Sequence, residues 1–116
     1  MTLAMMEVIS ELGGTPFEDI AADEPGQRLN FGPLEAEAVV RVGRFLHECV
    51  MLSCTVNGRR TMSLLETELP CQVNSREQGV ALLSYFLRDH IPKAMQPDWL
   101  RTSDQLAEYL PWNKKS

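Results

Sequence analysis

The sequence predicts a small α+β domain in which helices pack on a short antiparallel β-hairpin or sheet. Three observations lead to this fold class: an apolar stripe at helical spacing over 33–47, a turn signal inside a hairpin at about 49–67, and a capping box before an apolar helix at 75–91. The chain has 116 residues, which is enough to bury a core, and we expect residues 1–116 to form a single domain.

The N-terminal part of the chain combines a short helical pattern with a loop-like acidic stretch. Apolar residues within 3–12 recur at helical spacing, and the pair Gly13-Gly14 after them is typical of a helix C-terminus. Residues 15–27 are rich in proline, glycine and acidic side chains, which favours a loop. We therefore expect residues 1–32 to be an acidic segment, part of which is mobile.

Residues 33–47 carry the signals of an amphipathic helix. Pro33 suits the first helical position, and Glu35 and Glu37 fall near the N-terminus, where the helix dipole favours negative charge. The apolar stripe of this predicted helix consists of Leu34, Ala38, Val42, Phe45 and Leu46.

The hairpin at about 49–67 is predicted from the Asn-Gly pair at 57–58. A two-residue loop over this pair would place the apolar side chains of the first strand opposite polar side chains of the second. A three-residue loop over 56–58 instead pairs Leu52 with Met62, and it builds one apolar face from Val50, Leu52, Cys54, Met62 and Leu64. The competing interpretation extends the preceding helix to about residue 56, with Gly58 as its C-terminal stop.

The C-terminal part is predicted to be helical. Ser75 and Gln78 form the capping box of the helix at 75–91, which is apolar on almost every side and ends before Pro92. A second capping signature at 102–105 predicts a short helix at 103–110.

Charge is concentrated near the N-terminus. Residues 1–37 hold eight acidic side chains and one basic one, whereas residues 38–116 hold eight acidic and ten basic, for a net charge of −5. This balance argues against nucleic-acid binding, which needs a positive field over much of one face, and a basic partner surface suits it better.

The chain is expected to be cytoplasmic. No apolar run approaches the roughly 20 residues that span a bilayer, and the N-terminus carries Glu7 and Glu11 in place of the basic region of a secretory signal. Three cysteines, an odd number, favour a reducing compartment and free thiols.

Metal, cofactor and catalytic sites receive no assignment from the sequence. The separations between His47, Cys49, Cys54 and Cys71 match no standard zinc spacing, and Cys49 and Cys54 would point to opposite faces of a strand. No phosphate-binding loop or cofactor motif occurs in the chain.

Two groups of residues are candidate sites. The first is a patch of arginines that can grip carboxylates or phosphate, made of Arg59, Arg60, Arg41 and Arg44. The second is a pocket between the hairpin and the helix at 75–91, with side chains for acid/base or thiol chemistry, namely Glu66, Glu68, Cys71 and His90.

The leading functional hypothesis is a non-enzymatic interaction or regulatory module that binds a protein partner or itself. A homodimer is one possibility, because an isolated hairpin has edges that a second copy can pair with. The alternative is an enzyme or small-ligand-binding domain that uses the second group of residues, so a small-molecule ligand stays open.

Overall fold

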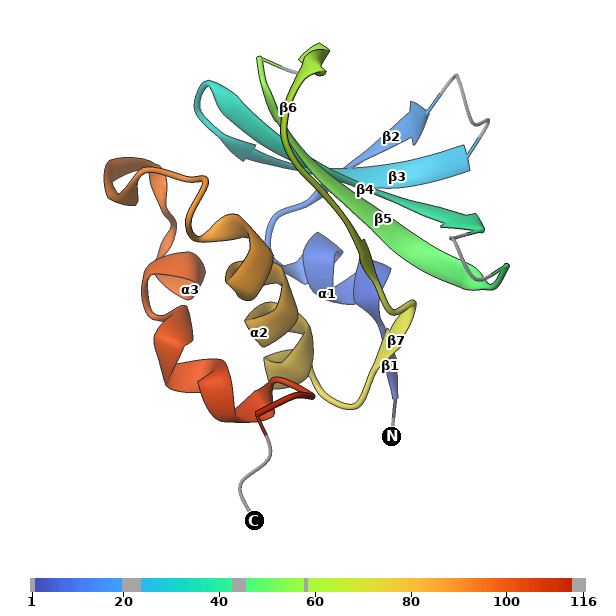
Figure 1. Ribbon diagram of the computed structural model, residues 1–116, viewed down its shortest axis with the longest axis vertical. Coiled ribbons are helices and arrows are strands. Elements are labelled where there is room, and N and C mark those ends of the chain that lie inside the picture. Colours follow the sequence, from blue (N-terminus) through green and yellow to red (C-terminus); the bar gives the residue numbers. More distant parts are fainter. Residues whose placement is uncertain (1, 20–23, 43–45, 58, 114–116) are drawn as a thin grey trace.

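A five-stranded antiparallel sheet forms the centre of the computed structural model, which describes residues 2–19, 24–42, 46–57 and 59–113 (Figure 1). The strand order β2-β3-β4-β5-β6 follows the chain. These strands are β2 Thr15–Asp19, β3 Glu24–Phe31, β4 Leu34–Val42, β5 Glu48–Val56 and β6 Arg59–Leu69.

Helices and a second small sheet complete the fold. The short strands β1 Leu3–Ala4 and β7 Gln72–Val73 pair with each other beside the main sheet. The helical elements are α1 Met5–Glu11, α2 Arg76–Leu87, η1 Lys93–Met95, α3 Asp98–Arg101 and η2 Ser103–Tyr109.

The predicted fold class is wrong, chiefly because the helix expected at 33–47 is a strand. Residues Leu34–Val42 form β4, which pairs with both β3 and β5. Leu34, Ala38 and Val42 are spaced by four residues, and this spacing keeps side chains on one face of a strand as well as of a helix. The apolar stripe therefore could not separate the two structures. Phe45 lies outside the described residues, and Leu46 is 87% exposed.

The loop expected at 15–27 is also wrong, whereas the strand favoured for the first half of the hairpin is confirmed. Within the expected loop at 15–27, residues Thr15–Asp19 form β2 and the following strand begins at Glu24. The competing extension of a helix to residue 56 fails as well, because Glu48–Val56 is β5. Pro16 is compatible with β2 because this strand lies at the sheet edge, where a missing N–H is tolerated.

The hairpin forms, but in a register that differs from the predicted one. Val56 pairs with Arg59 at the tip, and two register shifts near Thr55 then change the alignment of β6. The Cα partner of Leu52 is consequently Thr67, not Met62. Val50, Leu52 and Cys54 are buried as expected, whereas Met62 and Leu64 are exposed, because irregularities of this kind insert extra residues into one strand.

The helix α2 starts where its sequence signal places it. The Gln78 backbone N–H donates to Ser75 Oγ at 3.1 Å, so the predicted cap by Ser75 is confirmed. Gln78 Oε1 accepts from the Asn74 N–H at 2.7 Å and not from the Ser75 N–H, so the second hydrogen bond of the capping box differs by one residue. The predicted end of this helix is wrong, since α2 stops at Leu87. The Gln96 side chain donates to the carbonyls of Arg88 and Ile91, which holds the chain in its turn after the helix.

The remaining helical predictions need smaller changes. The predicted N-terminal helix is present as α1, and Gly13 after it has a φ of 102°, which suits glycine. The C-terminal segment expected at 103–110 is a 3₁₀ helix, Ser103–Tyr109, and Thr102 before it makes no capping hydrogen bond with its side chain.

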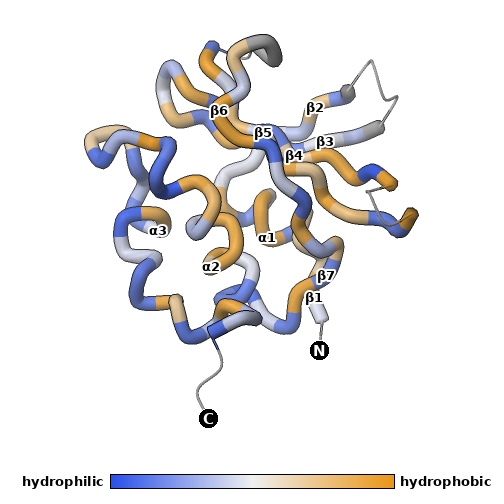
Figure 2. Tube along the Cα trace, in the orientation of Figure 1, coloured by the Kyte–Doolittle hydropathy of each residue, from blue (hydrophilic) through white to orange (hydrophobic). Residues whose placement is uncertain are grey.

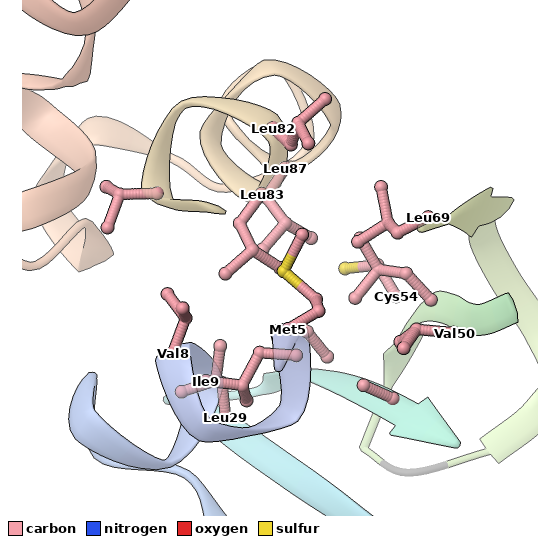
Figure 3. Close-up of a cluster of buried hydrophobic side chains, with 14 of the residues drawn as sticks. Met5, Val8, Ile9, Leu29, Val50, Cys54, Leu69, Leu82, Leu83 and Leu87 are labelled. Atoms are coloured by element: carbon pink, nitrogen blue, oxygen red, sulfur yellow. The ribbon is translucent and has the colours of Figure 1, made fainter. Parts of the chain in front are cut away.

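The core lies between the sheet and the two helices α1 and α2 (Figure 3). Hydrophobic residues dominate α1 and α2 in Figure 2. The sheet contributes even-numbered residues of β4 and β5 to this core, namely Ala36, Ala38, Val50, Leu52 and Cys54. Because side chains alternate along a strand, the odd-numbered residues of β4 and β5 point to the opposite face, which we call the open face.

Candidate functional site

Polar side chains on the open face are aligned across the strands. Arg28 pairs with Glu37, Glu37 with Ser53 and Ser53 with Glu66 as Cα partners, so one polar row crosses four neighbouring strands, β3 to β6. A second row, next to the first, is partly apolar and consists of Phe17, Gly26, Val39, Met51 and Glu68.

Arg28 fixes the carboxylate at the centre of the polar row. Its Nη2 lies 2.8 Å from Glu37 Oε2, and its Nε lies 3.5 Å from Glu35 Oε2. The Glu37 side chain is only 9% exposed, and a buried carboxylate needs such a partner to offset its lost hydration. The Arg28 guanidinium also lies over the Phe17 ring, 4.6 Å from its centroid.

Gly26 allows the Phe17 ring to lie across β3. A Cβ atom at Gly26 would be 2.7 Å from Cε1 and Cζ of that ring and 2.8 Å from the Ala38 carbonyl oxygen. Any larger residue would therefore displace the ring or the strand. Phe17 in this position forms one wall of a pocket on the open face.

The pocket has a volume of about 90 Å³ and is lined by both apolar and polar side chains. Its lining consists of Phe17, Glu37, Val39, Arg41, Met51, Ser53, Thr55, Ser63 and Glu66. Thr55 is 1% exposed, and its Oγ1 makes no hydrogen bond with any group in the described part of the chain. Leaving a buried hydroxyl unpaired costs about 1–3 kcal/mol, so this atom marks an unmet hydrogen bond at the pocket.

The predicted arginine patch is placed only in part. Arg41 lies on β4 and not on a helix, is half-buried, and lines the pocket. Arg44 and the side chains of Arg59 and Arg60 lie outside the described residues, so the patch remains a prediction.

The residues of the second predicted site do not lie together in one pocket. Glu66 lines the open-face pocket, whereas Glu68 and Cys71 line a more open groove of about 400 Å³ together with His47, Glu48, Cys49, Leu69 and Pro70. His90 follows α2 and lines neither of them. The space expected between the hairpin and α2 is occupied by buried side chains, among them Leu69 and Leu83 (Figure 3).

The thiols of this groove are held in their protonated form. Burial raises the pKa of Cys49, and the nearby Glu68 carboxylate and Cys71 thiol raise it further. Burial and the Glu48 carboxylate likewise raise the pKa of Cys71. A thiol acts as a nucleophile or metal ligand in its thiolate form, which these surroundings disfavour. No group of three or more His, Cys, Asp or Glu side chains in the described part of the chain is arranged to hold a metal ion.

Sequence reasoning missed most of the pocket. Phe17, Glu37, Ser53, Thr55 and Ser63 were not candidate site residues. The signal that could have found Glu37 is the alternation of acidic and apolar residues at the start of β4, which is typical of a strand with one buried face.

Comparison with models of known protein families, with curated proteins and with solved structures finds no match to this chain. Over the residues described, no helix has the length and apolar character needed to cross a membrane.

Proposed function

We propose that this chain is a non-enzymatic, cytoplasmic interaction module that binds a basic segment of a partner protein on the open face of its sheet. The observation that carries the proposal is the excess of carboxylates over basic groups among the described side chains of the open face. The described charged side chains on this face are the acids Glu35, Glu37, Glu66 and Glu68 and the bases Arg28 and Arg41.

Charge complementarity favours a basic partner segment. Among the described side chains of this face, four are acidic and two are basic, and Arg28 pairs with both Glu35 and Glu37. The whole chain has a net charge of −5, so its long-range field attracts the same kind of partner.

The size of the pocket favours a side chain of a partner over a small-molecule substrate. Ligand pockets for small molecules usually have about 300–1,000 Å³, and a pocket of about 90 Å³ is much smaller. The groove of about 400 Å³ is large enough, but the raised pKa values of Cys49 and Cys71 oppose the thiolate chemistry that would make it catalytic.

A second copy of the chain is a poor partner for the open face itself. A twofold interface would bring the same acidic side chains of both copies together, and like charges at an interface cost free energy. A homodimer that pairs strand edges would leave this face accessible. Light scattering at high protein concentration tests that dimer independently of the open face.

The proposed compartment follows from cysteine usage. All three cysteines are unpaired, two of them buried and one half-buried. Unpaired thiols in a chain that folds around an apolar core are typical of a reducing compartment.

The test uses labelled basic, neutral and acidic peptides of equal length, with binding followed by fluorescence anisotropy. Ser53→Arg places a cation in the middle of the polar row, and Ser10→Arg, the matched control, makes the same change at an exposed site on α1. We expect the basic peptides to bind wild type and Ser10→Arg, to bind Ser53→Arg at least about tenfold more weakly, and to lose affinity as salt rises. Equal binding of acidic peptides, or no effect of Ser53→Arg, would refute the proposal.

A further inference from the structure

The strand β6 is paired on one side only within the described part of the chain. It is the last strand of the main sheet, and its pairing partner there is β5. Among the described residues, no backbone–backbone hydrogen bond joins residues 59–69 to any other element. Every second residue of such an edge strand directs its N–H and C=O groups away from the sheet, where they can pair with another extended segment.

The two edges of the sheet differ in how well they accept another strand. The edge strand β2 has five residues and includes Pro16, which has no N–H group to donate. The strand β6 has 11 residues, and its sequence contains no proline. Its register shifts lie between Arg59 and Leu65, whereas residues 65–69 pair with β5 one to one. This regular part of β6 is therefore the better template for an added strand.

The exposure of β6 agrees with an open edge. Leu65 and Thr67 have Cys54 and Leu52 as their Cα partners, so they lie on the core face. Both partners on β5 are fully buried, whereas Leu65 and Thr67 are only half-buried. The loss of burial from β5 to β6 indicates that solvent reaches the outer side of the sheet at this point.

The two faces of the regular part of β6 differ in chemistry. Glu66 and Glu68 have Ser53 and Met51 as their Cα partners, so they lie on the open face, and both are exposed. On the core face, Leu65 presents a half-buried apolar side chain. A strand beside β6 would therefore have one row of side chains next to carboxylates and the other row next to apolar surface.

A second copy of the chain fits this edge less well than a basic segment does. Twofold antiparallel pairing of residues 65–69 with themselves, centred on Thr67, would set Glu66 opposite Glu68 of the second copy. Like charges directly opposite each other destabilise a pair of strands. Basic side chains at the same positions form favourable cross-strand pairs, so charge complementarity selects a basic segment.

We propose that an extended segment of the partner, with basic and apolar residues in alternation, adds to the sheet as a sixth strand beside β6. The inference rests on the proposed function, and it names the way in which the partner binds and the pattern of its sequence. Backbone hydrogen bonds to β6 hold the segment. Its basic side chains lie beside Glu66 and Glu68, and its apolar side chains cover Leu65.

Two blocked heptapeptides of equal composition and charge test the alternation. One is Lys-Val-Lys-Val-Lys-Val-Lys and the other is Lys-Lys-Lys-Lys-Val-Val-Val, each acetylated and amidated. The alternating peptide can place its lysines on the open face and its valines on the core face, whereas the other cannot. We expect fluorescence anisotropy to show at least about tenfold tighter binding of the alternating peptide.

Amide hydrogen exchange, followed by nuclear magnetic resonance, locates the bound peptide. Hydrogen bonds to an added strand should slow the exchange of every second amide within residues 65–69 by at least about tenfold in the saturated complex. A peptide that binds through side chains on the open face alone would leave these exchange rates unchanged.

A charge reversal at Glu66 tests the cross-strand contact. Glu66→Lys should weaken binding of the alternating peptide by about tenfold, because it replaces an attractive pair by a repulsive one. Glu108→Lys makes the same change of net charge at an exposed site on η2 and should leave the affinity unchanged. Unchanged amide spectra elsewhere in each variant show that the fold is intact.

The outcomes separate this inference from the proposed function. If both peptides bind equally well, Ser53→Arg weakens both, and the amide exchange of β6 is unchanged, the added strand is wrong and the open-face proposal stands. Protection of every amide within residues 65–69 in the free chain, together with a dimer mass in light scattering, would also overturn the inference, because a second copy would then occupy the edge. If no basic peptide binds, both proposals fail.

Discussion

Replacing Thr55 by valine should stabilise the fold. The two side chains have nearly the same shape, and the branched Cβ of valine suits a strand equally well. Thr55 is 1% exposed, and its hydroxyl has no hydrogen-bond partner in the described part of the chain. The substitution therefore removes an unpaired buried polar group without leaving a cavity.

The magnitude follows from the penalty for an unpaired buried hydroxyl, about 1–3 kcal/mol. We expect Thr55→Val to raise the free energy of unfolding by about 1 kcal/mol, the lower end of this range. For a domain of this size that gain raises Tm by about 4 °C.

Urea denaturation of wild type and Thr55→Val measures this difference, provided that the two m-values agree. Thr67→Val on β6, where the side chain is half-buried and remains in contact with water, is the control and should change stability by less than about 0.5 kcal/mol. A loss of more than about 1 kcal/mol in Thr55→Val would show that the hydroxyl is hydrogen-bonded in the folded chain, and the reasoning would then be wrong.

Three further changes test the fold around the site. Gly26→Ala brings a Cβ within 2.7 Å of the Phe17 ring, so we expect a loss of about 1–3 kcal/mol in urea denaturation; an unchanged stability would mean that the ring does not lie over β3. Ser75→Ala removes the acceptor of the Gln78 N–H and should cost about 1 kcal/mol, with lower helicity in circular dichroism. Burial raises the pKa of the Cys54 thiol above its ordinary value of 9.0, so the folded state holds this proton more tightly than the unfolded state does. The free energy of unfolding is therefore retained below pH 9 and falls as the pH rises above it. Denaturation of wild type and Cys54→Ala at increasing pH should show a steeper loss in wild type, and parallel curves would contradict the raised pKa.

The start of α2 was predictable because its signal is local. The capping box at Ser75 and Gln78 uses atoms of a single turn, so the sequence contains the whole motif and the structure reproduces its main hydrogen bond. Gly13 after α1 is a similar case, since a left-handed residue ends a helix without help from distant segments. The end of α2 was missed, and the turn that follows it is held by Gln96, a residue nine positions beyond Leu87.

The strand β4 was missed because its evidence is non-local. A stripe with a spacing of four residues fits a helix and a strand equally, and the residues that decide between them are the pairing partners in β3 and β5. The segment 15–27 was read as a loop for a related reason. Proline and glycine usually indicate an irregular backbone, but here each has a place in a strand. Pro16 lies in β2, which is an edge strand, and Gly26 leaves the space that the Phe17 ring occupies.

The site could not be predicted without the register of the strands. Glu37, Ser53 and Glu66 are 16 and 13 positions apart in the chain, and only the pairing of β4 with β5 and of β5 with β6 brings them into one row. Taken singly, each of them resembles an ordinary solvated strand residue. Glu66 was a candidate from sequence, but it was assigned to a pocket on the side of the sheet that the core fills.

The core and the pocket therefore both depend on the alternation of side chains between the two faces of the sheet. A slip of one residue in β5 would turn Ser53 toward the helices and Leu52 toward solvent, so every change that preserves the core also preserves the polar row. The two faces differ in what they require of each side chain. Leu52 contributes through burial alone, whereas the buried hydroxyl of Thr55, without a hydrogen bond to any described group, lowers stability. A polar group that destabilises the unbound fold in this way is expected where binding, and not stability, determines the residue.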